Sequence, residues 1–437
     1  MSKEVIRRLI SLAHDSLCRN SIKDALDCYN KVLCLDPDNA AARHFVAFVL
    51  DLQGQYAEAL PHALKAVEVH KCNADYYSTL ANVYRHLDNY QEAVIAAKTA
   101  CDLRPQEAMM WNNAAMLLAE EKRFDRAKAA YQYALQLEPE SSHIRFNYSL
   151  LLLALDDPEA WDEYEWRIPL NYSQPRPRYP KVFRDKKVLI KHEQGYGDFL
   201  MCARYFPLLR ELGAELHLET PRALDRLFPS TYCPRPDLTI YAMSLPLIFP
   251  ATPTEPYLIL DKNRKNERFS VGVAHRAVKQ FNNEVRITVD DERVQLLPHP
   301  ANLAWQSAKK RSLPEDWFDN FPTDVQLFNL QIDAPHPRIP SYGGIEDFKD
   351  LAQAVANMDL IITIDTSLAH LAGAMGKETW LILPYDSEWR WGQGDKTSWY
   401  PNTRIFRCPK RGDWASVEKE VTCNVQSRIS STTFPES

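Results

Sequence analysis

Small apolar residues recur along the first third of the chain at a fixed spacing of 34 residues. Two rows of alanines lie twelve positions apart, with an aromatic or aliphatic residue at a constant place between them. The three rows are Ala13, Ala47, Ala81 and Ala115; Ile22, Tyr56, Tyr90 and Phe124; and Ala25, Ala59, Ala93 and Ala127. Small residues recur at fixed places where neighbouring helices must approach closely. The pattern therefore predicts four helix–turn–helix units between about residues 6 and 141.

Each predicted unit ends on a position that holds proline in three of four cases. These positions are Pro37, Lys71, Pro105 and Pro139, again 34 residues apart. Proline stops the second helix before the next unit begins, and the lysine keeps the frame without the stop. A helix–turn–helix period of 34 residues is the signature of tetratricopeptide repeats. Because such a stack is built to hold a protein or peptide, we expect the chain to act on a protein partner.

The repeats are expected to end in a capping pair of helices at 142–166, which contains the aromatic and charged stretch EAWDEYEWRI. A terminal unit needs an altered pattern because no further repeat covers its outer face. We therefore assign residues 1–166 to the repeats with their cap. Residues 167–183 hold four prolines and few periodic apolar positions, which favours a stiff linker and a domain boundary.

After the linker, buried strands alternate with helices. The strand KKVLIKH (186–192) leads through a glycine turn into a helix that reaches about Leu212 and is closed by Gly213. The strand AELHLET follows, and then a helix from Pro221. Strands and helices at this spacing predict a parallel sheet, and we place a first Rossmann-like domain at 184–268.

A second α/β pattern opens with the apolar strand SVGVAH (270–275). The expected elements after it are a helix at 346–357, the strand DLIITID, a helix from Ser367 to Met375 and the strand TWLILP. Residues 277–304 fit either a long loop or an inserted hairpin. We place a second Rossmann-like domain at 269–422 and expect a loose Ser/Thr-rich tail at 423–437.

Composition narrows the partners and the compartment. The chain is 45% hydrophobic and 25% charged with a net charge of −6, which gives no support to nucleic-acid binding through bulk charge. Its nine cysteines form no CxxC pair, so a reducing cytosol fits best. The N-terminus does not resemble a signal peptide, and the longest aliphatic run, Leu150 to Leu155, is too short to span a bilayer. We expect a cytoplasmic protein without membrane insertion.

The first candidate site is the turn HEQGYGD, from His192 to Asp198. Gly195 and Gly197 let the backbone pass close to a bound group, and the helix that follows offers free N–H donors. Asp198 lies in the first helical turn, where it could face a ligand. Alternatively it serves only as a carboxylate that stabilises the helix N-terminus.

The second candidate site is IDTSLAHLAGAMG, where a buried strand meets a helix of small residues. Asp365, Thr366 and Ser367 would stand at the N-terminus of that helix, an arrangement that can hold a diphosphate. His370, one turn further on, could lie on the ligand side. The alternative is an ordinary N-cap with His370 as a satisfied core residue.

Two further segments could contribute to a phosphate or sugar site. The basic run Lys309-Lys310-Arg311-Ser312 could neutralise phosphate or form a solvated face. Trp389, Arg390 and Trp391, with Trp399 and Tyr400 close behind, could stack on a base or sugar or cover an inter-domain hinge. The acidic pairs Asp156-Asp157 and Asp290-Asp291 fit turns or surface positions better than a metal site.

Together these segments resemble a known family. The order of repeats, a WxEYEWR cap, a Pro-rich linker, HxEQGxGD, a KRS segment, DTSxAHLAGAxG, PxxxxWRW and WYP is similar to that of bacterial tetratricopeptide glycosyltransferases. Their catalytic part resembles the ADP-heptose heptosyltransferases and has the GT-B arrangement of two Rossmann-like domains. The resemblance covers nearly the whole chain. It implies an all-α repeat superhelix followed by a GT-B-like α/β pair.

The resemblance also implies roles for individual residues. Asp198 corresponds to the general base, and the donor-binding residues are Gly195, Gly197, Lys310, Arg311, Ser312, Asp365, Thr366, Ser367, His370, Trp389 and Arg390. Enzymes of this kind need no metal or other cofactor besides the nucleotide-sugar co-substrate, and they invert the anomeric centre. One departure concerns the opening of the second domain. Either SVGVAH or NLAWQS (302–307) is its first strand.

The expected function is therefore transfer of a sugar from a nucleotide sugar to a protein acceptor that the repeats recruit. Flagellin or another surface protein is the acceptor suggested by family analogy. The alternative is a repeat scaffold whose transferase-like part binds nucleotide sugar or a partner protein without turnover. The repeats could also serve self-association into a homo-oligomer.

Overall fold

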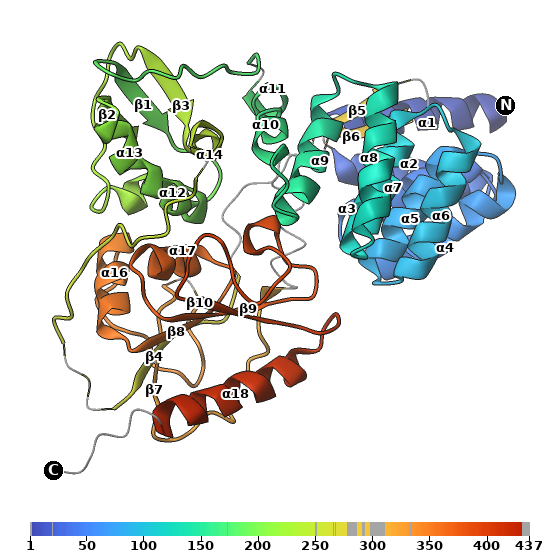
Figure 1. The fold of residues 1–437 in the computed structure, drawn as a ribbon. Coiled ribbons are helices and arrows are strands. Elements are labelled where there is room, and N and C mark those ends of the chain that lie inside the picture. Colours follow the sequence, from blue (N-terminus) through green and yellow to red (C-terminus); the bar gives the residue numbers. More distant parts are fainter. Residues whose placement is uncertain are drawn as a thin grey trace. The chain divides into compact units, whose positions relative to one another are not determined.

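The computed structural model describes residues 2–19, 21–172, 174–249, 251–264, 266, 268–277, 286–290, 293–297, 311–332 and 334–430. The chain divides into two compact units (Figure 1). A helical unit comprises Met1–Leu152, Trp166–Arg176 and Asn282–Leu303. An α/β unit comprises Leu153–Glu165, Pro177–Phe281 and Ala304–Ser437.

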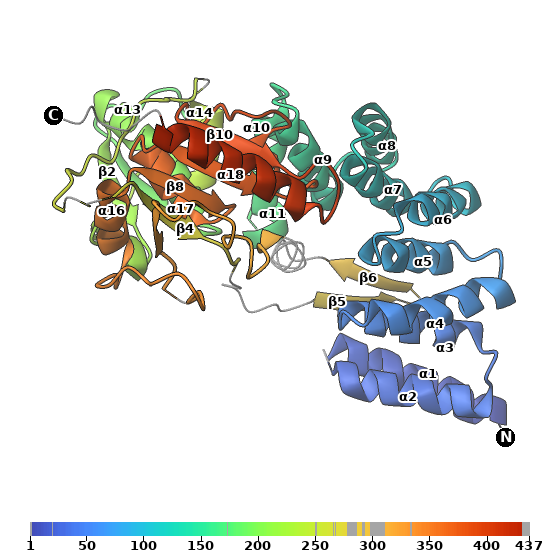
Figure 2. The same cartoon turned by 90° about the horizontal axis from the view of Figure 1, so that it is seen from below.

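The helical unit contains the four predicted helix–turn–helix units, whose helices follow one another in Figure 2. The pairs are α1 (Ser2–Cys18) with α2 (Ile22–Leu35), α3 (Ala40–Leu52) with α4 (Tyr56–Val69), α5 (Ala74–His86) with α6 (Tyr90–Leu103), and α7 (Ala108–Glu120) with α8 (Phe124–Leu137). Helix α9 (Ser142–Ala154) follows. Helix α11 (Arg167–Tyr172) also belongs to this unit, although the residues before and after it in the sequence belong to the α/β unit. All eight alanines of the two predicted rows are buried, which confirms that they serve close helix packing.

The frame of the repeats explains the helix ends. Ile22, Tyr56, Tyr90 and Phe124 are the first residues of the four second helices. Pro37, Lys71, Pro105 and Pro139 each stand two positions after the last residue of those helices. At that place proline adds no strain and prevents the helix from continuing.

One element of the frame escaped the sequence analysis. The turns between first and second helices hold Gly54, Asp88 and Lys122, with φ of 78°, 60° and 56°, and these residues are also 34 positions apart. The turn requires the left-handed conformation at this position, which glycine adopts freely and other residues adopt at a cost. Because the residue type varies, no row of identical residues marks the position.

An antiparallel hairpin occupies part of the segment for which a loop or a hairpin was expected. Strands β5 (Arg286–Asp290) and β6 (Arg293–Leu297) pair with Ile287 opposite Leu296 and Val289 opposite Val294. The hairpin belongs to the helical unit, where β5 contacts α1. An insertion between strands of the second sheet therefore joins the repeats.

The α/β unit contains two parallel sheets, as predicted. The first has the order β2-β1-β3, formed by β2 (Glu215–Glu219), β1 (Lys187–Lys191) and β3 (Leu238–Tyr241). The second has the order β10-β9-β8-β4-β7, formed by β10 (Thr403–Arg407), β9 (Thr379–Leu383), β8 (Leu360–Ile364), β4 (Ser270–Ala274) and β7 (Gln326–Asn329). Strands β4, β8 and β9 are buried along their whole length, as expected for the centre of a parallel sheet with both faces covered.

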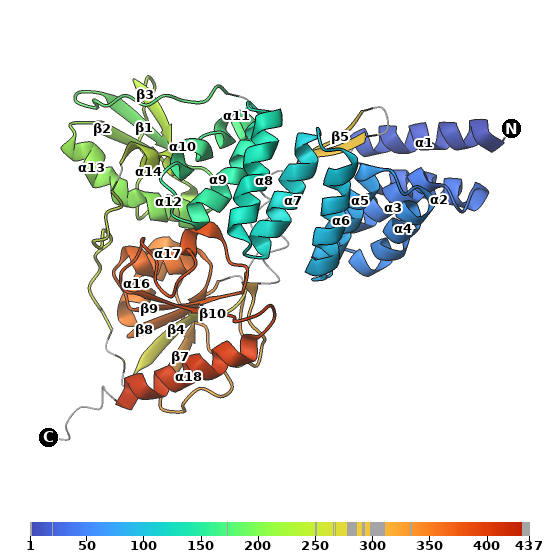
Figure 3. The ribbon, with the colours of Figure 1, turned by 45° about the vertical axis from the view of Figure 1, so that its right-hand side comes forward.

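Helices precede, connect and follow the strands (Figure 3). They are α10 (Ala160–Tyr164), α12 (Tyr196–Cys202), α13 (Phe206–Glu211), α14 (Leu245–Ile248), α16 (Phe348–Asn357), α17 (Ser367–Ala374) and α18 (Trp414–Ser430), with single 3₁₀ turns at Ala203–Tyr205, Arg222–Leu224, Ala242–Ser244 and Trp389–Trp391. Helices α12, after the first strand of the first sheet, and α17, after β8 of the second, contact each other. This contact brings the two sheets' strand ends together within one unit.

Several expectations about the α/β unit need correction. The helix expected up to Leu212 is interrupted by a 3₁₀ turn at Ala203–Tyr205, and the new helix α13 begins at Phe206 with Pro207 in its first turn. The helix expected from Pro221 is only a 3₁₀ turn at Arg222–Leu224. Strands β3, β7 and β10 were not predicted.

Boundaries also differ from those expected from composition. The tail expected to be loose from residue 423 is helical up to Ser430 as the end of α18, where Val421 and Val425 are buried. The supposed linker contains helix α11, and the capping residues Leu153–Glu165 belong to the α/β unit. Strand β4 lies inside the second sheet, so SVGVAH opens that sheet, whereas NLAWQS lies outside the described residues.

In the described parts of the chain, none of the helices combines the length and apolar composition needed to cross a membrane.

Candidate functional site

The side chain of Asp198 caps the start of α12. Gly195 precedes the helix, and its backbone N–H donates to Asp198 Oδ2 at 2.9 Å. This is the helix-stabilising role that was the alternative to a ligand-facing one. The cap holds the carboxylate in a fixed position directly after strand β1, whatever further role it has.

The second oxygen of this carboxylate binds a residue from the other sheet. Arg390, from the turn after β9, donates from Nε to Asp198 Oδ1 at 2.7 Å, and its Nη2 contacts the same oxygen. Both side chains are largely buried. Although burial opposes the charge, Asp198 and Glu388 together raise the pKa of Arg390 above its usual value. A full ion pair therefore joins segments 192 positions apart in the chain.

A second arginine binds the carboxylate that follows β8. Arg311 Nη1 donates to the backbone oxygen of Asp365 at 3.1 Å and to its Oδ2 at 3.2 Å. Burial opposes ionisation of Asp365 most strongly, but Arg311, Arg390 and the other groups that face this carboxyl together lower its pKa. The link between the two pairs is Glu388, whose Oε1 lies 3.6 Å from Arg311 Nη1 and whose Oε2 contacts Arg390 Nη1. We call Asp198, Arg390, Glu388, Arg311 and Asp365 the charge cluster.

The other predicted donor-binding residues of the two segments that contain Asp365 and Arg311 differ in their contacts. Thr366 is the N-cap of α17, but its hydroxyl makes no capping hydrogen bond to the first N–H groups of the helix. Ser367 is the first residue of that helix. Ser312 accepts the Ala277 N–H at 3.0 Å and so ties its segment to the end of β4. Lys310 lies outside the described residues.

His370 is a packed residue of the interior. Its ring stacks on Trp391 with centroids 4.9 Å apart, and Nδ1 lies 3.0 Å from the Tyr400 hydroxyl. Burial lowers the pKa of His370 to about 4, so the ring is neutral near pH 7. This packing fits the alternative reading of His370 as a core residue. It also places the ring against Gly197.

A larger residue at position 197 should destabilise the protein, because the His370 ring packs closely against Gly197. A Cβ at this position would lie 2.6 Å from His370 Cδ2, and the ring cannot retreat because Trp391 and Tyr400 hold it. We expect Gly197→Ala to lower the free energy of unfolding by about 1–3 kcal/mol, measured by chemical denaturation. Gly343→Ala is the matched control, since a Cβ there meets nothing within 4 Å. An unchanged stability of Gly197→Ala would show that the helices α12 and α17 are not held at this distance.

The large aromatic residues take part in packing between segments of the α/β unit. Trp389 packs edge-on against Trp161 of α10, with ring centroids 5.6 Å apart. The buried guanidinium of Arg204 lies over Trp399 and Tyr400, and its Nη1 donates to the backbone oxygen of Trp399 at 2.7 Å. Trp399 and Tyr400 therefore cover the junction of the two sheets, which was one of the two roles expected for them.

The sequence analysis missed Gln194, which contacts the charge cluster. Gln194 Nε2 donates to the Tyr164 hydroxyl at 2.7 Å, and Gln194 Oε1 accepts from Arg390 Nη2 at 3.4 Å. Gln194 has a φ of 60°, an unfavourable conformation for a residue other than glycine. Glu388 was missed as well. Gln194 and Tyr164 stand inside the quoted motifs EQGYGD and WDEYEWR, whereas Glu388 directly precedes Trp389 and lacks a motif of its own.

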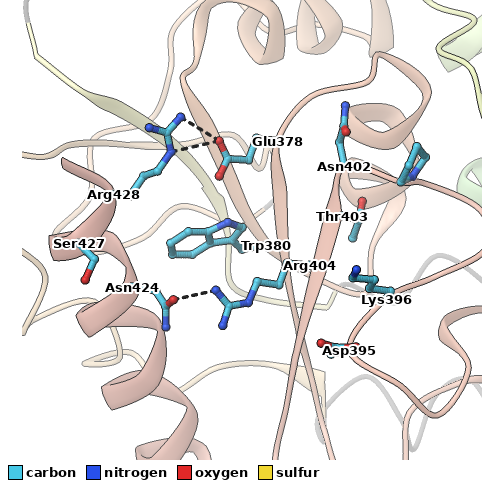
Figure 4. Close-up of a pocket in the computed structure, with 11 residues that line it drawn as sticks. Glu378, Trp380, Asp395, Lys396, Asn402, Thr403, Arg404, Asn424, Ser427 and Arg428 are labelled. Carbon is cyan, nitrogen blue, oxygen red and sulfur yellow. Dashed lines mark hydrogen bonds and ion pairs between the residues drawn. The ribbon is translucent and has the colours of Figure 1, made fainter. Parts of the chain in front are cut away.

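A separate cavity of about 610 Å³ lies at the other end of the second sheet (Figure 4). It is lined by Trp380 near the start of β9, Arg404 near the start of β10, and residues of α18. Its arginines are paired, Arg428 with Glu378 and Arg404 with Asn424. Ligands of parallel α/β sheets bind at the carboxyl ends of the strands, where the charge cluster stands, so we assign no function to this cavity.

Comparison with known proteins identifies the repeats. The model of the tetratricopeptide repeat family matches residues 49–108 and 112–160. The repeats are tetratricopeptide repeats. Repeats of this kind generally mediate interactions between proteins. Solved structures are also similar to part of the chain, among them PilF of Pseudomonas aeruginosa, with 18% identity, 53% of this chain and 95% of that chain covered, and a TM-score of 0.38.

Two curated proteins are similar to the chain in sequence, one over most of its length and one over about a third of it. Protein FlbA of Caulobacter vibrioides is 24% identical over 437 residues, which cover 86% of this chain and 71% of that protein. The human protein O-mannosyl-transferase TMTC1 is 28% identical over 161 residues, which cover 34% of this chain and 18% of that protein. The chain therefore spans less than a fifth of the human relative.

Proposed function

We propose that the α/β unit is a glycosyltransferase of the GT-B type, which moves a sugar from a nucleotide sugar to a protein held by the tetratricopeptide repeats. The observation that carries the proposal is the charge cluster. It joins a carboxylate after the first strand of one parallel sheet to two arginines and a helix N-terminus at the strand ends of the other. The carboxyl ends of parallel strands are where such folds bind nucleotides.

In the proposed reaction an acceptor hydroxyl or amide of the protein attacks the anomeric carbon of the donor. Asp198 takes the acceptor proton as the new bond forms, and the bond from the anomeric carbon to the diphosphate oxygen breaks. The nucleoside diphosphate leaves with that bonding pair. Arg311, Arg390 and the N–H groups of α17, beginning at Ser367, offset the charge that develops on it. Attack from the opposite face inverts the anomeric centre.

Two further observations support a protein as the acceptor. Helix α10, which follows the last helices of the repeat array in sequence, contributes Tyr164 to the surroundings of Arg390 through Gln194. The partial similarity to a protein O-mannosyl-transferase points to the same class of reaction. We propose that the repeats raise the concentration of the acceptor near the cluster, with a bacterial surface protein such as flagellin as the first candidate.

A second function is favoured by one specific observation. Both carboxylate oxygens of Asp198 already hold protein donors, the Gly195 N–H and the Arg390 guanidinium. An α/β unit that binds nucleotide sugar without turnover, attached to a repeat scaffold, would have this arrangement permanently. The next experiment separates the two functions.

The test is transfer by the full chain. The protein is incubated with a panel of nucleotide sugars that differ in base and sugar, together with a cell lysate, and intact-protein mass spectrometry detects sugar-sized mass shifts. We expect one donor to be consumed and one class of protein to gain mass. Binding of a donor without consumption would favour the scaffold, and binding of none would remove the nucleotide-sugar site altogether.

A further inference from the structure

Glu388 is the residue that connects the two arginines of the charge cluster. It lies in the segment between β9 and the turn Trp389–Trp391, and its two carboxylate oxygens face different guanidinium groups. One oxygen lies 3.6 Å from Arg311 Nη1, and the other contacts Arg390 Nη1. A bridging anion between two arginines is the arrangement that a diphosphate would also adopt.

When all its groups are ionised, the charge cluster does not favour the binding of an additional anion. Asp198, Asp365 and Glu388 are opposed by Arg311 and Arg390, so the ionised cluster carries one excess negative charge. His370 adds none, since its pKa is lowered to about 4 by burial. An anionic ligand can bind these arginines well only if one carboxylate leaves or takes up a proton.

Glu388 is the carboxylate best placed to leave. Its side chain is 30% exposed, compared with 11% for Asp198 and 7% for Asp365. Asp198 is anchored by the Gly195 N–H as well as by Arg390, and Asp365 directly follows a buried strand. Glu388 stands in an irregular segment, where a side chain can rotate toward solvent without disturbing a helix or a strand.

We propose that Glu388 is an internal counter-anion that the diphosphate of the donor displaces, and that this exchange draws Arg390 away from Asp198. The carboxylate of Asp198 then becomes available to the acceptor only in the donor complex. The order of binding, donor before acceptor, follows from the exchange. The inference rests on the proposed function, because it assumes that the arginines bind a nucleotide sugar.

The groups that face Glu388 give the exchange a pH dependence. Burial, assisted by Asp365, raises the pKa of Glu388, and Arg390 and Arg311 oppose this rise. Asp198 adds to the negative field. Protonated Glu388 no longer competes for the arginines, so affinity for a diphosphate should rise as the pH falls through the raised pKa of this group.

The test measures the dissociation constants of nucleotide sugars for the wild-type full chain and for Glu388→Gln as a function of pH. Nucleotide sugars are suitable probes because their diphosphate diester does not titrate in the range in which carboxylates do. Glutamine keeps the size of the side chain and removes its charge. We expect Glu388→Gln to bind at least about tenfold tighter near neutral pH. We also expect wild-type affinity to rise on mild acidification, whereas that of the variant changes less.

Equal or weaker binding by the variant, or a wild-type affinity that does not rise on acidification, would overturn the exchange while leaving the glycosyltransferase proposal in place. The wild-type pH series decides the question even if the variant folds poorly, since it needs no substitution. Failure of the wild type to bind any nucleotide sugar at any pH would instead refute the proposed function, and the exchange with it.

Discussion

Asp198→Asn is expected to reduce sugar transfer by about 10²- to 10⁴-fold, the usual contribution of a positioned general base. The carboxylate can act in this way in the donor complex, where the proposed exchange has drawn Arg390 away. The Gly195 N–H then occupies only one of the about four lone-pair sites that its two oxygens offer. The rate is measured as donor consumption in the presence of the acceptor identified by mass shift.

The structure also predicts a cost in stability that the sequence alone did not indicate. An asparagine at this position has one acceptor oxygen, so its NH₂ group must face either the Gly195 N–H or the Arg390 guanidinium. Two donors then meet in a largely buried place, and we expect a loss of about 1–3 kcal/mol in the free energy of unfolding. Transfer must therefore be assayed well below the unfolding temperature of the variant, with donor binding measured on the same sample.

Asp347→Asn is the matched control. Asp347 is also a helix-capping carboxylate that pairs with an arginine: it accepts the Lys349 N–H at 2.8 Å and lies 3.0 Å from Arg226. It caps α16 and is not a member of the charge cluster. We expect full transfer activity from this variant. If Asp198→Asn retained the wild-type rate as well, Asp198 would be a helix cap and not the base.

The repeats could be predicted from the sequence almost residue by residue, because one local geometry recurs four times. Spacing alone located the first residues of the second helices and the positions that follow their ends. Gly54, Asp88 and Lys122 escaped because the backbone at that turn demands a conformation, not a residue type. A pattern search finds positions at which the same side chain recurs. It does not find a recurring left-handed backbone conformation when different residues adopt it.

The candidate site could be predicted only in part, for a related reason. Asp198, Asp365, Arg311 and Arg390 each stand beside a local signal, such as a glycine turn, a strand end or a basic run. Their pairing could not be inferred, since it depends on how α12 packs against α17. Glu388 and Gln194 owe their roles entirely to that packing.

In the α/β unit, the sequence predicted the central strands of the second sheet but not its edge strands. Strands β4, β8 and β9 were found because central parallel strands are continuous apolar runs. Strands β7 and β10 lie at the two edges of the second sheet, where burial alternates or is partial. Strand β3 is short, with one fully buried position, Ile240. These strands resemble loop sequence until their neighbours are known.

Arg390→Met should be the most destabilising of the substitutions considered. The variant keeps most of the side-chain volume but leaves Asp198 and Glu388 without the cation that both contact. Removing one partner of a buried ion pair typically costs about 3–5 kcal/mol, because a charge remains in a place of low polarity. Chemical denaturation near neutral pH, with the slope checked for two-state behaviour, measures the loss.

Two features distinguish this mechanism from a loss of packing. The double variant Asp198→Asn/Arg390→Met removes one uncompensated charge, so it should be more stable than the sum of the single losses predicts. The deficit of Arg390→Met should also shrink as the pH falls. The pKa of Glu388 is already raised in the folded protein, and a group of this kind favours folding at low pH and loses that contribution as the pH rises.

Arg226→Met provides the comparison at the surface. Arg226 contacts two carboxylates, those of Asp347 and Asp350, each at 3.0 Å, but its side chain is 54% exposed. Water screens its partners after the substitution, so we expect stability close to that of the wild type. If Arg390→Met were equally mild, or if its deficit did not depend on pH, the charge cluster would not be the electrostatic unit that the distances indicate. Neither Asp198 nor the diphosphate exchange could then depend on Arg390.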